Sequence, residues 1–295
     1  MVASLLCSLL FAFSAVCGNR STRILGGVQA NFWRILLATF FLGLYAHSLG
    51  SGFSGAGLPI FLLSGLIGFG VGDLALYQAL PRLGSRLSIM IVHCLAAPFA
   101  ALLEWIWLGT TLTTAEICAS LIILIGVAVA LSPSEHIDTH RTAFKLGIFY
   151  ATLAALGQGG GAVLSRKAYE VLTAAAQNID GITAAYQRIW GGVGIALLSM
   201  LLLFFRTPSN FSTAPIKKAS GWVFLNALAG PALGVSVFQW ALATTPTGIV
   251  LPIVALTPLL IIPFAKFIEG EHASLRSIMG GAVAVLGVIL LGMVA

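Results

Sequence analysis

The sequence predicts an all-α membrane protein in which ten transmembrane helices form two inverted five-helix repeats. Three observations carry this prediction. The 295 residues are 59% hydrophobic and only 8% charged. Ten apolar runs are each long enough to cross a bilayer, and the second half of the chain repeats the pattern of the first at a nearly constant spacing.

The composition excludes an ordinary soluble domain. Fifteen basic and nine acidic residues are too few to cover the surface of a soluble protein of this size, in which about 25% of residues are charged. A lipid environment removes this demand, because the outer surface can then be apolar. The net charge of +6 does not indicate nucleic-acid binding, because the basic residues lie singly or in pairs at the ends of apolar runs. The expected surrounding is therefore the lipid bilayer.

The apolar runs place ten helices along the chain. A helix needs about 20 apolar residues to cross the hydrocarbon core. Residues 1–4 carry no basic side chain, so the first run is interpreted as a membrane helix and not as a signal peptide. The runs lie near residues 3–19, 29–48, 58–80, 86–108, 112–132, 144–164, 182–205, 220–243, 247–268 and 274–294.

An internal repeat divides these runs into two units, residues 1–132 and 144–294. Residues 72–80 (GDLALYQAL) resemble residues 235–242 (VSVFQWAL), and Pro98 corresponds to Pro258. The offset stays at about 160–162 residues through both hairpins. Because five is odd, the second unit enters the membrane from the opposite side, and such inverted repeats are typical of transporters with a site near the midplane.

The order of these motifs resembles the drug/metabolite transporter superfamily (DMT), and in particular its EamA-type members. The second helix of each unit opens with an aromatic segment that ends in arginine, at residues 32–34 (FWR) and 186–188 (YQR). The hairpins that contain Pro98 and Pro258 follow in the same order. The turn Gly270-Glu271 is similar to the family's Gly-Glu turn, whereas the first unit has Gly109-Thr110.

The resemblance implies a secondary transporter that exports or exchanges small metabolites or drugs. It implies coupling to protons or solute exchange, and no cofactor and no nucleotide-hydrolysing domain. Two related packings, one open to each side, follow from inverted symmetry and predict alternating access. The expected location is the plasma (inner) membrane.

Three charged residues inside apolar runs are candidates for the site. A charge in the bilayer costs roughly 2.5–3.5 kcal/mol on insertion scales, so each needs a reason. Asp73 lies in the third run and is either a proton or cation site or a structural partner of an arginine or helix end. The repeat relates Arg34 to Arg188 and predicts that they face opposite sides of the membrane. They hold an anionic substrate, latch a gate, or extend to the headgroups.

Polar and aromatic residues in mid-helix predict a central cavity lined by helices three, four, six, eight and nine or their repeat mates. His93 is either a cavity residue or a satisfied packing residue. The cavity is expected to touch several of the candidates Asp73, Tyr77, His93, Gln158, Gln239 and Trp240. Pro98 and Pro258 are candidates for helix breaks, and Glu104 and Glu269 are expected at the membrane interface.

The remaining glycines and cysteines are expected to pack helices together, and the sequence gives little support for functions other than transport. The small-xxx-small spacings Gly68/Gly72 and Gly157/Gly161 let helices approach closely. The four cysteines lie in apolar runs without metal-ligand spacing, so no metal site is expected. A membrane-embedded lipid-processing enzyme would need clustered acids or histidines, and a passive channel would need parallel pore-lining helices. These two classes remain the alternatives, and enzymatic activity is not expected.

The distribution of basic residues disagrees with the resemblance about orientation. The loops after helices 1, 3, 5, 7 and 9 contain or adjoin eleven Lys or Arg residues, and the opposite side has only Arg166 and Lys167. Short basic loops stay in the cytoplasm, so this count places both termini outside. The resemblance implies that both termini are cytoplasmic. The eleven residues are Arg20, Arg23, Arg82, Arg86, Arg141, Lys145, Arg206, Lys217, Lys218, Lys266 and Arg276.

Overall fold

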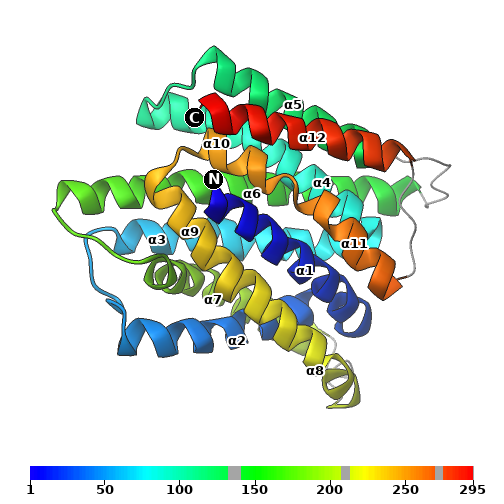
Figure 1. Ribbon diagram of the computed structural model, residues 1–295. Coiled ribbons are helices and arrows are strands. Elements are labelled where there is room, and N and C mark those ends of the chain that lie inside the picture. Colours follow the sequence, from blue (N-terminus) through cyan, green and yellow to red (C-terminus); the bar gives the residue numbers. More distant parts are fainter. Residues whose placement is uncertain (132–140, 207–212, 270–274, 295) are drawn as a thin grey trace.

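The computed structural model describes residues 1–131, 141–206, 213–269 and 275–294, and these form a bundle of helices joined by short turns (Figure 1). Within these described ranges, eight helical segments are long and apolar enough to span a membrane, and α5 and α12 contain two shorter apolar helices. The Gly270-Glu271 turn lies outside the described residues. The helices are α1 (Val2–Leu25), α2 (Gly27–Ser48), α3 (Leu58–Gly65), η1 (Leu66–Gly72), α4 (Asp73–Leu108), α5 (Thr114–Leu131), α6 (Arg141–Ala174), α7 (Gly181–Arg206), α8 (Thr213–Ala227), η3 (Leu228–Gly234), α9 (Val235–Thr244), α10 (Thr247–Val254), α11 (Thr257–Glu269) and α12 (Leu275–Val294).

Several expected runs are built from more than one helical segment. The third run comprises α3, η1 and the start of α4, and Gly84 then turns the chain with φ of 76°, a conformation that favours glycine. The expected connection at residues 81–85 is therefore a tight turn. The chain is interrupted before Pro258, because α10 ends at Val254 and α11 begins at Thr257. Pro98 differs from the expectation: it lies in α4, where the one residue with non-helical dihedral angles is Gly84.

Among the described residues, each unit contains one π-helical segment, and the two lie at equivalent places. The segment η1 begins at Leu66 and η3 at Leu228, and their separation (228 − 66 = 162) equals the repeat offset. π-helical turns are rare and are often found at functional sites. The helix contacts also correspond, since α1 packs on α8 and η3 as α6 packs on α3 and η1. These shared features relate the two five-helix units beyond their sequence.

Glycine pairs allow close helix contacts near the centre. A Cβ on Gly157 would lie 2.6 Å from the Cα of Gly72, and one on Gly161 would lie 3.3 Å from the Cα of Gly68. The predicted small-residue spacings therefore face each other, and they let α6 pack directly against η1. The outer pair α5 and α12 lies side by side in Figure 1 and is similarly close at Gly126 and Gly280.

Candidate functional site

A central cavity of about 100 Å³ lies between the two units. Its walls come from α1, α2, η1 and α4 of the first unit and from α6, α7, η3 and α9 of the second. The ninth run, α10 and α11, contributes none of the described lining residues, contrary to expectation, while α2 and α7 do contribute. Six predicted residues line the cavity together: Arg34, Asp73, Tyr77, His93, Gln158 and Arg188.

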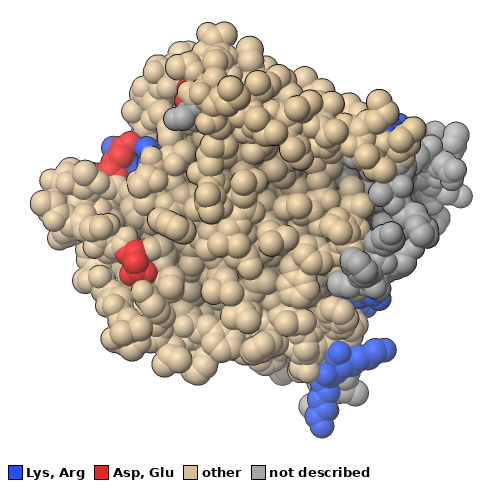
Figure 2. Space-filling model, viewed as in Figure 1, with Lys and Arg blue, Asp and Glu red and all other residues tan. Residues whose placement is uncertain are grey.

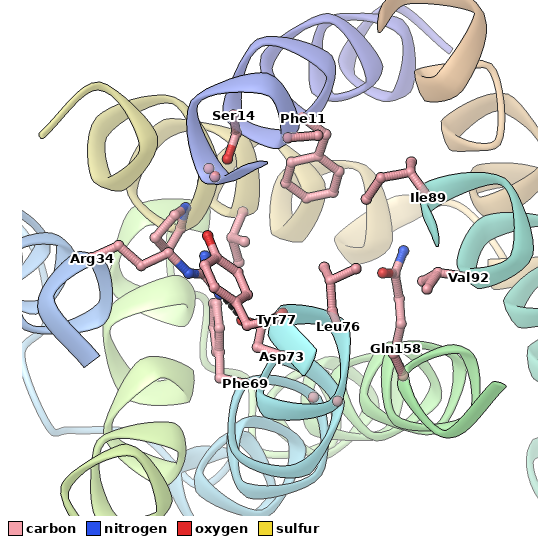
Figure 3. Close-up of a pocket in the computed structure, with 18 of the residues that line it drawn as sticks. Phe11, Ser14, Arg34, Phe69, Asp73, Leu76, Tyr77, Ile89, Val92 and Gln158 are labelled. Carbon is pink, nitrogen blue, oxygen red and sulfur yellow. Dashed lines mark hydrogen bonds and ion pairs between the residues drawn. The ribbon is translucent and has the colours of Figure 1, made fainter. Parts of the chain in front are cut away.

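Arg34 and Asp73 form an ion pair in the cavity wall (Figure 3). Arg34 also donates from Nε and Nη2 to Asn31 Oδ1 at 3.1 and 3.0 Å. Its guanidinium carbon lies 4.5 Å from the centre of the Tyr77 ring, over the face that attracts cations. The side chain of Arg34 is only 6% exposed, so it extends into the protein and not to the headgroups.

Tyr77 belongs to a hydrogen-bonded chain that joins the two units. Asn226 Nδ2 donates to the Tyr77 hydroxyl, and Ser14 Oγ donates to Asn226 Oδ1 at 2.7 Å. In Figure 3, Ser14 on α1 points towards the cavity opposite Tyr77. The chain therefore connects α1 and α4 of the first unit with α8 of the second.

Arg188 is held by a second chain of hydrogen bonds. Its Nε donates to Ser64 Oγ at 2.8 Å, and the Ser64 hydroxyl donates to Gly161 O at 2.6 Å. Because the single Ser64 proton is used there, Ser165 donates to Ser64 across 2.9 Å and accepts from Gln239 Nε2 at 3.2 Å. Arg188 and Arg34 thus reach the same cavity, whereas the repeat had predicted opposite sides of the membrane.

The other part of the cavity is less polar. Gln158 Nε2 and His93 Nδ1 are 2.8 Å apart, and the ring of Phe11 stacks on His93 at a centroid distance of 6.3 Å. His93 is thus both a cavity residue and hydrogen-bonded. Figure 3 shows Ile89 and Val92 on the side of Gln158, away from Arg34 and Asp73. The cavity is therefore charged at one end and lined by uncharged, mostly apolar side chains at the other.

Two predicted residues lie outside the cavity wall. Gln239 is fully buried but contacts Ser165 and is absent from the lining, and Trp240 is 60% exposed. Successive residues on a helix point about 100° apart, so when Gln239 faces α6, Trp240 faces outward. The cavity thus touches several of the six candidates, as expected, but not these two. Gln239 instead reaches Arg188 through the two serines.

Glu104 is a correction to the expectation of an interfacial position. Its side chain is 2% exposed and forms an ion pair with Arg166 at 3.2 Å. The other carboxylate oxygen accepts from the Thr247 backbone N–H at 2.7 Å and from the Thr247 hydroxyl. Arg166 also donates to Leu242 O at 2.9 Å. The side chain of Glu269 lies outside the described residues.

Two residues of the site, Ser64 and Asn226, were not predicted from the sequence. Both are fully buried, and both lie just before the π-helical segment of their unit. They are 162 residues apart (226 − 64 = 162), so they are repeat equivalents. Each is an isolated polar residue in an apolar run. Their equivalent positions in the two repeats are the feature of the sequence that could have identified them.

The comparisons with known proteins identify the family. Residues 1–132 and 145–293 match the EamA-like transporter family. The chain belongs to this family. An uncharacterized transporter from Archaeoglobus fulgidus is 23% identical over 300 residues, which cover 99% of this chain and 97% of that protein. One solved structure, described only as the crystal structure of a protein, has a TM-score of 0.70 at 18% identity and covers 100% of this chain and 98% of that one.

Membership in the EamA-like family makes this chain an integral, multi-pass membrane transporter. Family and relative both point to a transporter and not to an enzyme. The similarity to the solved structure shows the fold alone at this level of identity. Within the described residues, no three His, Cys, Asp or Glu side chains lie close enough together to hold a metal ion.

Proposed function

We propose that this EamA-like transporter is a secondary transporter that exports or exchanges small metabolites by alternating access through the central cavity. The observation that carries the proposal is that both repeat units contribute helices to the cavity wall. Four lining elements of the first unit, α1, α2, η1 and the start of α4, have their repeat equivalents α6, α7, η3 and α9 in the lining, whereas the later part of α4 has no described counterpart there. A site shared by two related units is what a rocking motion of one unit against the other requires.

The size of the cavity favours small solutes over drugs as substrates. A drug-sized ligand fills a pocket of roughly 300–1,000 Å³, whereas this cavity measures about 100 Å³. A drug would require the helices to separate in this conformation. Small metabolites fit with less rearrangement, although both were expected from the family resemblance.

The buried Glu104–Arg166 pair supports a gated pathway. It links α4, α6, α9 and α10 at the end of the bundle where α9 ends and α10 begins. In the proposed mechanism these contacts break when the cavity opens toward that end. The opposite end, at the Gly84 turn and the beginning of α8, opens in the alternate state.

Flux measurements with the purified protein in proteoliposomes test the proposal. Vesicles loaded with unlabelled amino acids, carboxylates or nucleosides are diluted into the same labelled compound. A secondary transporter gives saturable uptake that is accelerated by the internal solute. Flux that rises linearly with concentration would instead support a passive channel, and conversion of the vesicle lipid would support a lipid-processing enzyme.

A further inference from the structure

Arg188 is a cavity cation that forms no ion pair with a described carboxylate, and it shares the more distant charge of Asp73 with Arg34. Asp73 is the one carboxylate among the described lining residues, and it is paired with Arg34. No carboxylate oxygen in the described parts of the chain lies within 4.0 Å of the Arg188 guanidinium. With His93 neutral, the lining side chains carry two positive charges and one negative charge. The repeat equivalent of Asp73 is Val235 (73 + 162 = 235), so the second unit supplies no matching acid.

The surroundings hold Arg188 in place while leaving its terminal nitrogen atoms available. The Nε group is fixed by Ser64, and the guanidinium carbon lies 5.2 Å from the centre of the Phe69 ring. Two glycines make room for the guanidinium group, since a Cβ on Gly68 or Gly161 would lie 2.5 or 2.7 Å from Arg188 Nη2. The two Nη groups make no hydrogen bond to a described residue.

We propose that Arg188 binds the carboxylate of a small organic monoanion, and that such monoanions are the substrate class of this transporter. This inference rests on the proposed function and deepens it. A buried charge without a counter-charge is costly, and the planar guanidinium matches a carboxylate with two parallel N–H···O bonds. The free Nη groups of Arg188 are the donors for these bonds.

The charge balance and the shape of the cavity narrow the substrate further. A monoanion brings the net charge of the occupied cavity to zero, whereas a phosphate dianion would leave a negative charge and a neutral solute a positive one. The apolar part of the substrate lies against Phe11, Leu76, Ile89 and Val92, which line the remaining wall together with His93 and Gln158. The charged group and the hydrocarbon body of one small carboxylate thus match the two ends of the cavity.

Thermal unfolding of the full-length protein in detergent tests this inference with matched probes. The probes are pairs of a carboxylate and its neutral amide, such as propionate with propionamide and benzoate with benzamide. We expect the Tm to rise with at least one carboxylate and to rise less with the matching amide. Equal stabilisation by both members of every pair, or stabilisation by none, would overturn the proposal.

Substitutions test whether Arg188 causes the preference for the carboxylate over its amide. In Arg188→Gln the affinity for the carboxylate should fall roughly tenfold to a hundredfold, which corresponds to the loss of a hydrogen-bonded charge, and the amide should be affected little. Arg188→Lys keeps the charge but loses the planar fork, so it should retain part of the preference. The matched control is Arg206→Gln, at the exposed end of the same helix α7, which should leave the preference unchanged.

The stability of the ligand-free variant separates a binding role from a structural one. An arginine kept for the substrate is an uncompensated buried charge, so Arg188→Gln should unfold at the same or a higher Tm than the natural protein. A clear fall in Tm with an unchanged carboxylate preference would assign Arg188 to structure. Binding without counterflow would refute the transport function alone, whereas counterflow of a carboxylate that is unaffected by Arg188→Gln would refute this inference alone.

Discussion

At the scale of single residues, the Arg34–Asp73 ion pair compensates two charges that lie inside membrane-spanning helices. Asp73 has the counter-charge that its position demands, and Arg34 is further bound by Asn31 and covered by the ring of Tyr77. A buried charge that loses its partner is destabilising by about 3–5 kcal/mol. The ion pair is therefore stable as long as Asp73 is ionised. The side chain of Asp73 is 22% exposed and is open to the cavity.

Proton coupling through Asp73 is testable at this scale. Asn has nearly the same shape as Asp and keeps an oxygen that accepts from Arg34, but it cannot release a proton. If Asp73 carries the coupling proton, Asp73→Asn should abolish uptake driven by a pH gradient and spare solute exchange, because exchange moves no net proton. The measurement compares both fluxes in proteoliposomes, with Glu116→Gln, a partly exposed acid at the start of α5, as the control. Unchanged pH-driven uptake in Asp73→Asn would assign the residue to structure.

The sequence identifies charged residues of the site better than uncharged ones. Arg34, Asp73 and Arg188 stand out because any charge within an apolar run needs a partner. Ser64 and Asn226 do not, because uncharged polar residues in membrane helices often pack without function. The choice between Gln239 and Trp240 depends on the rotation of α9 about its axis, which the apolar pattern on both sides leaves open.

At the scale of helices, the Glu104–Arg166 pair joins the ends of two elements. Glu104 accepts the backbone N–H of Thr247 at the start of α10, and Arg166 donates to the Leu242 carbonyl in the last turn of α9. An acid at a helix N-terminus and a base at a C-terminus both compensate the helix dipole. The pair therefore fixes the turn between α9 and α10 as well as neutralising its own charges.

Removal of the Glu104 charge should loosen the beginning of α10. Glu104→Gln leaves Arg166 without its counter-charge and weakens the bond to Thr247, so the first backbone amides of α10, from Thr247 onward, should exchange hydrogen for deuterium faster. Exchange mass spectrometry measures this effect. Glu116→Gln is the matched control, because Glu116 accepts the Thr113 N–H at the start of α5 and should change exchange there alone. Unaltered exchange in α10 would show that Glu104 does not hold this turn.

The helical runs themselves could be read from the sequence, but their internal breaks could not. Ten apolar stretches of the right length suffice to place the spans. The π-helical segments η1 and η3 depend on backbone hydrogen bonds shifted by one residue, which composition does not reveal. The position of Glu104 was misread because it lies close to the end of its run, where a sequence pattern alone does not separate the bilayer interface from a buried helix contact.

At the scale of the whole molecule, charge separates the two ends of the bundle. Figure 2 shows Lys and Arg at one end, near the start of α8, and Asp and Glu near the other. On the acidic side, Arg166 pairs with Glu104 and Lys167 with Glu170. This visible separation agrees in direction with the sequence count, and the rule for short loops then predicts that the basic end faces the cytoplasm.

Orientation is therefore a prediction about the whole chain. The charge rule places both termini outside the cytoplasm, although the family resemblance implies the reverse. A reporter fused after the last residue decides between them: alkaline phosphatase, which is active outside, should be active, and a fluorescent protein that matures only in the cytoplasm should stay dark. Fluorescence at this position would refute the orientation without affecting the fold.

The central claim is that the cavity between the two units is the transport pathway and opens to each side in turn. A single cysteine at Val92, which lines the cavity, tests it in a variant whose four natural cysteines (Cys7, Cys17, Cys94 and Cys118) are replaced. A charged thiol reagent that cannot cross the bilayer should react with Val92→Cys when added from either face, and should then stop counterflow. Trp240→Cys, on the outward face of α9, should not stop counterflow. Reaction at Val92→Cys from one face only, or labelling without loss of flux, would contradict the account.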